Sequence, residues 1–554
     1  MSVRNGFVLL FALSALTFLV ACGGSSSGIA TPTPPPTGGF TNANLNGTYV
    51  FSVSGADATG GAYAMAGTIT ADGSGGNGKG GITGGSFDLT DTTAGTVTGA
   101  PINNNSFYSI SVDGRGQATL GNTVSGLGNL TLDFVLQDST HGLVTEFDSF
   151  GTGSGTIDLQ AAGVTPNGSY AFSLSGASGS SPWATVGNFT LTGTTMAGLA
   201  DLNEGGLSIL SDQALSGSLV LTSSSGPATT LTISTFSGTF DAFAIDATHL
   251  KLIETDGATT LSGDAFSQTS TDFPTGSLSF TLQGETLSGP FAAGGIMTTT
   301  GTSISGTEDY NQNGSVSSAS TPPPFTAAYT ASGTGRFTLG GFSSGFVGGT
   351  SYAAYPFTNG SVDGLLLLEI DGTGITTGAA YSQSASATLA ASQGYGLNLS
   401  GVNLTASASN GGTVEVDDIA EFTANSTGNT ITGVIDENSN LDGPATFSAP
   451  FVNNSTATST YTTPTGGRGQ IGASVGTSSN DTTLNGGFLL TYYTVDGTTF
   501  PFIETDSGQV SAGVFVQQNP SASASAARPA MFVVQPLIRP HASAKKQKQI
   551  KLTN

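Results

Sequence analysis

The chain has 554 residues, with 82 glycines, one cysteine and a formal net charge of −24. All 36 Asp and Glu lie between residues 41 and 520, where only five Lys and Arg stand, so this body carries a net charge of −31. An acidic body repels phosphate groups, which excludes nucleic acid as a partner. A single cysteine permits no internal disulfide.

The first 21 residues have the pattern of a signal peptide. A short start that contains Arg4 precedes an uncharged apolar stretch from Phe7 to Val20. This stretch is shorter than the roughly 20 residues that a membrane-spanning helix needs. We therefore expect residues 1–21 to be removed on export.

The residues Leu19, Val20, Ala21 and Cys22 resemble the lipobox of bacterial lipoproteins. This resemblance implies cleavage before Cys22, acylation of its thiol and anchoring of the exported protein to a membrane. In that family an Asp after the cysteine signals retention in the inner membrane, whereas this chain has Gly23. The resemblance thus predicts an outer-membrane or cell-surface location.

Two uncharged or basic segments flank the acidic body. Residues 22–40 are rich in Gly, Ser and Pro and contain too few large apolar side chains to fold, so they predict a tether. Residues 521–554 contain six Lys and Arg and no acid. This tail is predicted to be disordered, with contact to anionic lipid or to the acidic body as the alternative.

The body is a fourfold repeat. In each copy a Glu is followed by Asp at +2, Gly at +9 and Gln at +14. The copies are Glu146, Asp148, Gly155, Gln160; Glu254, Asp256, Gly263, Gln268; Glu369, Asp371, Gly378, Gln383; and Glu504, Asp506, Gly513, Gln518. The repeat predicts four domains of ordinary size, at residues 41–162, 163–270, 271–386 and 387–520.

Two further landmarks recur within the units. A Gly that precedes an Asp and an Asn occurs in three copies: Gly198, Asp201, Asn203; Gly306, Asp309, Asn311; and Gly433, Asp436, Asn438. The first unit keeps only Gly84 and Asp88. Units 1, 3 and 4 also share a Tyr followed by an Arg, namely Tyr108 and Arg115, Tyr329 and Arg336, Tyr461 and Arg468, whereas unit 2 lacks the Arg.

Alternating apolar and polar residues between glycine-rich turns predict an all-β fold. In unit 1 the expected strands are 48–54, 62–71, 79–88, 95–101, 107–113, 117–122, 130–137, 143–148 and 154–160. Turns this short join antiparallel neighbours, and a meander leaves exposed edges unless it closes. The sequence thus predicts four tandem antiparallel β-meander domains, each a small up-and-down barrel of about eight strands, with β-sandwiches as the alternative.

The repeated Glu and Asp lie two residues apart and so share one face of a strand, where paired carboxylates could serve glycoside hydrolysis. An active site is seldom copied four times in tandem. The favoured interpretation is that each Glu pairs with the Arg of its own unit, since a buried charge needs a partner. The expected pairs are Arg115 with Glu146, Arg336 with Glu369, and Arg468 with Glu504.

Two segments resemble the first half of a calcium loop. They contain Asp309, Asn311 and Asn313, and Asp436, Asn438 and Asn440. Calcium takes six to eight oxygens, usually with a Glu at position 12, where this chain has Ser320 and Thr446. Asx turns are therefore the favoured interpretation, with calcium as the alternative and no other cofactor expected.

The histidines indicate no catalytic centre. His141 and His249 occupy equivalent positions after Asp138 and Asp246, but the other two units have Gly364 and Thr499 there. A base that half of the copies omit is better explained as a turn residue. We therefore expect no catalytic residue in the repeats.

Three functions remain in order of preference. The signature resembles that of secreted and lipid-anchored bacterial tandem β-repeat proteins, which implies location and fold class but no activity. The leading hypothesis is a non-enzymatic surface protein whose tandem domains form a structural or adhesive array, with a glycan or surface protein as partner. The second is a binding protein that holds small apolar or sugar ligands inside its barrels. The third is a glycan hydrolase that uses the Glu and Asp pairs.

Overall fold

The computed structural model describes residues 39–75, 78–221, 229–233, 238–317, 320–444, 449–453, 457–476 and 487–521. The predicted signal peptide, Cys22, most of the tether and the basic tail from residue 522 lie outside these ranges. Within them, no helix is long and apolar enough to cross a membrane.

The first two units consist of strands with short turns. Unit 1 contains the 3-10 helix η1 (Asn42–Asn44), β1 (Asn46–Asp57), β2 (Ala62–Asp72), β3 (Gly80–Asp91), β4 (Gly95–Pro101), β5 (Phe107–Ile110), β6 (Arg115–Leu120), β7 (Leu130–Leu136), β8 (His141–Glu146) and β9 (Gly151–Leu159). Unit 2 contains β10 (Gly168–Ser178), β11 (Ser181–Thr192), β12 (Thr195–Glu204), β13 (Ser208–Leu221), β14 (Thr229–Ile233), β15 (Gly238–Ala244), β16 (His249–Glu254) and β17 (Ser262–Ser267).

The last two units repeat this order. Unit 3 contains β18 (Gly276–Thr286), β19 (Gly289–Thr300), β20 (Ser303–Gln312), β21 (Ser315–Val316), β22 (Pro324–Ala331), β23 (Phe337–Gly340), β24 (Ser351–Asn359), β25 (Val362–Glu369) and β26 (Gly374–Ser382). Unit 4 contains β27 (Gln393–Asn403), α2 (Leu404–Asn410), β28 (Glu415–Asn425), β29 (Thr430–Ser439), β30 (Gly443–Pro444), β31 (Ala449–Pro450), β32 (Thr460–Tyr461), β33 (Arg468–Ala473), β34 (Phe488–Tyr493), β35 (Thr499–Glu504) and β36 (Gln509–Gln517).

The units are antiparallel meanders that curl into barrels, which confirms the predicted barrels and not the sandwiches. The strands β10 to β17 form a closed eight-stranded barrel. In units 1 and 3 the pairings of β2 with β3 and of β19 with β20 complete the ring, and β4 and β21 are short additions outside it. Unit 4 closes through a single residue pair of β29 and β32, Thr430 with Thr460.

The inward side chains fill the barrels. The first strand of every unit contributes three alternating apolar residues to its own core, because successive side chains of a strand point to opposite faces. These residues are Tyr49, Phe51 and Val53; Tyr170, Phe172 and Leu174; Leu278, Phe280 and Leu282; and Tyr395, Leu397 and Leu399. Each barrel interior is therefore a packed core of side chains.

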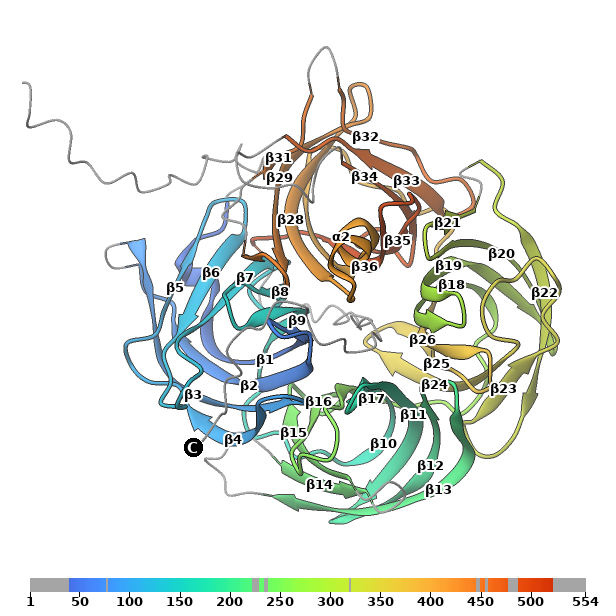
Figure 1. The fold of residues 1–554 in the computed structure, drawn as a ribbon, viewed down its shortest axis with the longest axis horizontal. Coiled ribbons are helices and arrows are strands. Elements are labelled where there is room, and N and C mark those ends of the chain that lie inside the picture. The colour runs from blue at the N-terminus through green and yellow to red at the C-terminus, as the bar shows by residue number, and fades with distance from the viewer. Residues whose placement is uncertain are drawn as a thin grey trace, which may run out of the picture.

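The four barrels stand in a closed ring (Figure 1). The first strands of unit 2 (β10 to β12) pack on the last strands of unit 3 (β24 to β26), and unit 3 uses β18 to β20 against β34 to β36 of unit 4 in the same way. Unit 1 packs β2 and β3 on β15 and β16, and unit 4 packs β27 to β29 on β7 to β9 of unit 1. A head-to-tail interface of this kind closes after four copies and leaves no terminal unit.

The Gly at +9 of the repeat is explained by close approach of two backbones. A Cβ on Gly155, Gly263, Gly378 or Gly513 would lie 1.7, 2.1, 2.0 or 2.1 Å from a carbonyl oxygen of the unit's first strand. In each case the glycine lies on the last strand, where that strand pairs with the first one to close the barrel. Only glycine permits this closure.

We predict that Gly378→Ala destabilises the protein by about 3 kcal/mol, because its Cβ would collide with the Thr281 carbonyl and force β18 and β26 apart. Gly340→Ala in the same unit is the matched control, since the nearest atom to its Cβ would be 3.8 Å away. Urea denaturation of both variants checks the difference. Equal stabilities for the two variants would contradict this explanation.

Candidate functional site

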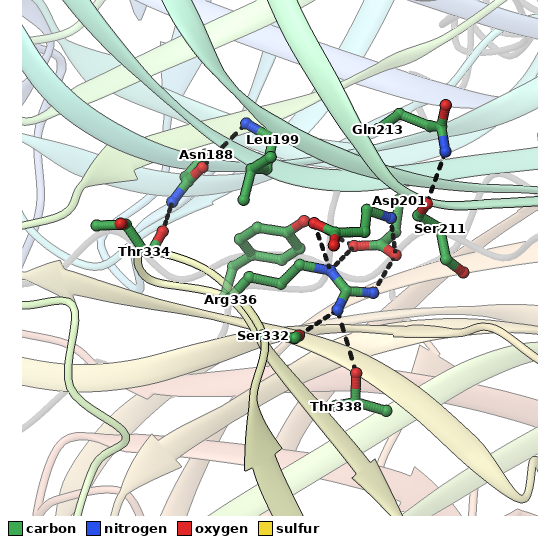
Figure 2. A network of polar contacts seen from close by, with 11 residues as sticks. Asn188, Leu199, Asp201, Ser211, Gln213, Ser332, Thr334, Arg336 and Thr338 are labelled. Atoms are coloured by element: carbon green, nitrogen blue, oxygen red, sulfur yellow. Dashed lines mark hydrogen bonds and ion pairs between the residues drawn. The ribbon is translucent and has the colours of Figure 1, made fainter.

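The polar residues that the repeat shares gather where one unit meets the next. We name these interfaces by their units: the 1–2, 2–3, 3–4 and 4–1 seams. At the 2–3 seam, Arg336 Nε and Nη2 donate to the two carboxylate oxygens of Asp201 over 2.7 and 2.5 Å. The Tyr355 hydroxyl also donates to Asp201 over 2.6 Å. Figure 2 shows this forked ion pair, which joins units 2 and 3.

The same pairing occurs at two other seams. At the 3–4 seam, Arg468 Nε and Nη2 each donate to Asp309 over 2.7 Å, and Tyr493 donates over 2.8 Å. At the 4–1 seam, Arg115 Nη1 donates to Asp436 over 2.9 Å, while its Nε binds Asp113 of its own unit. The last pair connects the final unit to the first one.

This arrangement corrects the expected pairing of Arg115, Arg336 and Arg468 with Glu146, Glu369 and Glu504. Each Arg instead binds the Asp of the preceding unit. A prediction made within one repeat could not find this partner, because Asp201 and Arg336 lie in different copies and only the ring brings them together.

The Asn two residues after that Asp also reaches across a seam. Asn203 Nδ2 donates to the carbonyls of Glu369 and Gly374 over 2.8 and 3.0 Å. The other copies bind the equivalent turn of the next unit: Asn311 donates to the carbonyls of Glu504, Asp506 and Gln509, and Asn438 donates to those of Glu146 and Gly151. The Asn thus fixes the Glu–Asp turn of its neighbour.

The Gln at +14 binds the next unit in all four copies. The Nε2 atom of Gln160 donates to the Ala244 carbonyl, that of Gln268 to the Pro356 carbonyl and that of Gln383 to the Gly466 carbonyl. Gln518, near the end of the ring, donates to Asp113 and Leu136 of unit 1 over 2.8 and 3.0 Å. Conserved spacing within the repeat therefore reflects contacts between repeats.

The repeated Asp at +2 organises the turn after its own strand. One oxygen of Asp148 accepts from the Phe150 amide and the other from the Thr131 amide of the neighbouring strand, each over 2.7 Å. The other units repeat both hydrogen bonds. Asp256 accepts from the amides of Ala258 and Thr239, Asp371 from those of Thr373 and Ser351, and Asp506 from those of Gly508 and Leu489. The Asp is engaged by backbone donors in every copy.

The repeated Glu is enclosed at the barrel end. Glu146 accepts a hydrogen bond from Tyr63, Glu369 from Thr373 and Thr376 over 2.9 Å each, and Glu504 from Ser511. Burial raises the pKa of Glu369 to about 8, and the charge of Asp371 adds to this shift. A protonated, enclosed Glu beside an Asp that caps a turn does not make the open carboxylate pair that hydrolysis requires.

The calcium candidates have protein partners. Asp309 and Asp436 hold the Arg of the next unit, and Asn311 and Asn438 donate to carbonyls. Asn440 accepts from the Glu415 amide, and Asn313 has a positive φ of 49° in a tight turn. In the described ranges no three His, Cys, Asp or Glu side chains are grouped to hold a metal.

His141 and His249 begin strands β8 and β16, where His141 is half-buried and His249 is buried, whereas the sequence predicted turn residues. His141 Nδ1 lies 2.8 Å from Asp158, and His249 Nε2 lies 2.6 Å from Asp264, which Lys251 also contacts at 2.6 Å. Although burial opposes it, the His141 hydrogen bond and the Lys251 charge lower the pKa of Asp158 to about 2. These residues form a charge cluster between units 1 and 2.

The 1–2 seam differs from the others. Unit 2 (residues 163–270) contains no Arg. Phe243 occupies the position in its strand that Tyr355 and Tyr493 occupy in units 3 and 4. An apolar cluster of Val50, Ala64, Ala66, Phe243, Ile245 and Ile253 fills the seam. Burial and nearby Asp241 raise the pKa of Asp88, which has no Arg opposite it, to about 7.

Comparison with known proteins gives a limited result. No family model matches the chain, and no curated protein matches it. Among solved structures, transferrin binding protein B from serogroup B Neisseria meningitidis matches with 11% identity and a TM-score of 0.18, covering 71% of this chain and 86% of that one. A mutant of transferrin binding protein B from Haemophilus parasuis Hp5 matches with 9% identity and a TM-score of 0.20, covering 70% and 84%. At these TM-scores we draw no conclusion about function from the likeness.

We predict that Arg336→Ala lowers the stability of the protein by about 3–5 kcal/mol, because it leaves the carboxylate of Asp201 buried without its cation. The matched control is Lys79→Ala, which removes the same charge from an exposed site. Thermal and urea denaturation at neutral pH measure both. A change in Arg336→Ala no larger than in the control would show that the forked pair does not hold the seam.

Stability should also fall as the pH rises. Burial raises the pKa of Glu254 and Glu369 to about 8, so the folded state binds more protons than the unfolded chain above pH about 4. The stability that these protons provide is complete below that pH and is lost as the pH rises through about 8. Glu369→Gln should make this decline shallower by thermal melts between pH 5 and 9, whereas half-exposed Glu204→Gln should not. Identical pH profiles for Glu369→Gln and the parent protein would refute the assignment.

Proposed function

We propose that this chain is a non-enzymatic, lipid-anchored surface protein whose four barrels form one rigid scaffold that presents binding surfaces outside the cell. The observation that carries the proposal is the use of the repeated polar residues. The Asp and Asn of the Gly–Asp–Asn landmark, the Arg and the Gln all bind the neighbouring unit, as in Asp201 with Arg336. Chemistry copied in each repeat thus serves assembly.

Two alternatives are less well supported by the geometry. A carrier of ligands inside the barrels needs room there, but packed aromatic and aliphatic side chains occupy the interiors. A hydrolase needs two accessible carboxylates, but Glu146 and Glu369 have 0% exposure.

The scaffold sits behind the proposed tether. Phe40, the last residue of the proposed tether, is buried in the core of unit 1, and its amide donates to the Val112 carbonyl over 3.0 Å. Acyl chains on Cys22 would hold the body to the membrane, and the proline run would extend it away. A glycan or a surface protein is the proposed partner class.

The anchoring part of the proposal predicts that Cys22→Ala abolishes lipid attachment and releases the protein from the membrane fraction. Incorporation of labelled palmitate, followed by fractionation and protease treatment of intact cells, measures attachment and exposure. Ser25→Ala is the control, because it changes the tether and leaves the thiol. Equal labelling of Cys22→Ala and the parent chain, or protection from protease on intact cells, would oppose the proposal.

A further inference from the structure

A cleft opens on the 1–2 seam. Its volume is about 620 Å³, and its walls are residues 90–95 of unit 1 together with Gly179 and residues 257–260 of unit 2. Neither unit forms the cleft alone, since one wall follows β3 and the other is the Glu–Asp turn after β16. This volume lies within the range of about 300–1,000 Å³ that small-molecule sites occupy.

The equivalent place on the 4–1 seam is nearly closed. There the corresponding segments, residues 439–443 of unit 4 and the turn around Asp148 and Gly151 of unit 1, enclose only about 120 Å³. The two clefts are lined by matching positions of the repeat, and their volumes differ about fivefold.

One residue of the cleft lining differs from its equivalents at the other seams. Asn438 crosses the 4–1 seam to the carbonyls of Glu146 and Gly151. The residue in that position of unit 1 is Thr90, whose Oγ1 shares a hydrogen bond with Thr96 of its own unit and makes one contact across the seam, to the Thr259 carbonyl over 3.3 Å. Thr90 therefore binds the turn through one hydrogen bond where Asn438 makes two, and its shorter side chain leaves room in the seam.

Two polar atoms in the cleft lining have no protein partner. Asp91 has 4% exposure, and its Oδ1 accepts from the Thr93 and Ala94 amides over 2.6 and 2.8 Å, but its Oδ2 has no hydrogen bond. The Thr259 hydroxyl on the opposite wall is also without a hydrogen bond. Buried polar atoms nearly always have partners, so this pair, on opposite walls of one cleft, offers hydrogen bonds that a ligand can complete.

We propose that this cleft binds a neutral, hydroxyl-rich ligand of the size of a disaccharide or trisaccharide, which donates to Asp91 Oδ2 and exchanges a hydrogen bond with the Thr259 hydroxyl. The lining is made of threonines, glycines and alanines around one carboxylate, so it offers hydrogen bonds without a cation or an aromatic ring. The net charge of −31 on the body disfavours anionic ligands. This inference rests on the proposed function and names where its glycan partner would bind, whereas the Cys22→Ala test of the anchor is independent of sugar binding.

A divalent cation fits the cleft less well. Calcium requires six to eight oxygen ligands, whereas the lining has one carboxylate, and one of its two oxygens is already used by backbone amides. The remaining oxygen, Asp91 Oδ2, can accept one hydrogen bond from a ligand hydroxyl group.

The test is titration of the purified full-length protein with maltose, cellobiose, lactose and chitobiose, by calorimetry and by ligand-observed NMR. We expect at least one of these sugars to bind. Asp91→Asn keeps the Oδ1 acceptor and replaces the free Oδ2 by a donor, and Thr259→Val removes the free hydroxyl with little change of shape. Each should weaken binding about tenfold or more, while exposed Thr302→Val should leave it unchanged.

A gain-of-contact variant separates binding from misfolding. Thr90→Asn should restore the contact of the other seams, close the cleft and abolish sugar binding, with a melting temperature equal to or above that of the parent protein. Binding that survives both Thr90→Asn and Asp91→Asn would overturn the proposal. Failure of all four sugars to bind would also overturn it, as would a calcium-induced rise in melting temperature that is lost in Asp91→Asn without any sugar binding.

Discussion

The structure depends on one interface used four times. The first strands of each barrel present their outer faces to the last strands of the next, so these faces are buried although they point away from their own core. Ala171 of β10, for example, has 0% exposure and packs in a cluster shared among units, while its neighbours Tyr170 and Phe172 fill the barrel. Because the contact is head-to-tail, four copies satisfy every face only when the fourth meets the first.

This interface explains how so acidic a chain buries its charge. Four of the five cations of the body lie at seams: Arg115, Arg336 and Arg468 each bind an Asp of the preceding unit, and Lys251 lies in the cluster between units 1 and 2. Isolated buried carboxylates respond differently, by holding their protons, as the raised pKa of Glu369 illustrates. Three Arg–Asp ion pairs therefore cross between units, while Glu369, which has no cation beside it among the described residues, is stabilised in its neutral form.

The 1–2 seam departs from the residue pattern of the other seams. The 1–2 seam has no Arg, and it has a Phe instead of a Tyr and a Thr instead of an Asn. Apolar contact through Phe243 and Ile253 stands where the other seams have an Arg–Asp ion pair. The cleft of about 620 Å³ lies at the same seam, whereas the corresponding cleft of the 4–1 seam has about 120 Å³. Relaxing one of four equivalent interfaces can create a site without disturbing the other three, because each seam uses its own residues.

The sequence determined the strands, the meander and the barrel, since alternation and glycine spacing are local properties: the expected strand at 95–101 coincides with β4, and that at 62–71 differs from β2 by one residue. The repeat also marked the residues that matter, including Gly378 and Gln518. Only the tertiary structure decided what they contact. Arg336 finds Asp201 in another copy, and Asn438 finds a turn almost 300 positions earlier in the chain. Periodicity within a repeat carries no information about which copy lies next to it, and the partners therefore followed from ring closure alone.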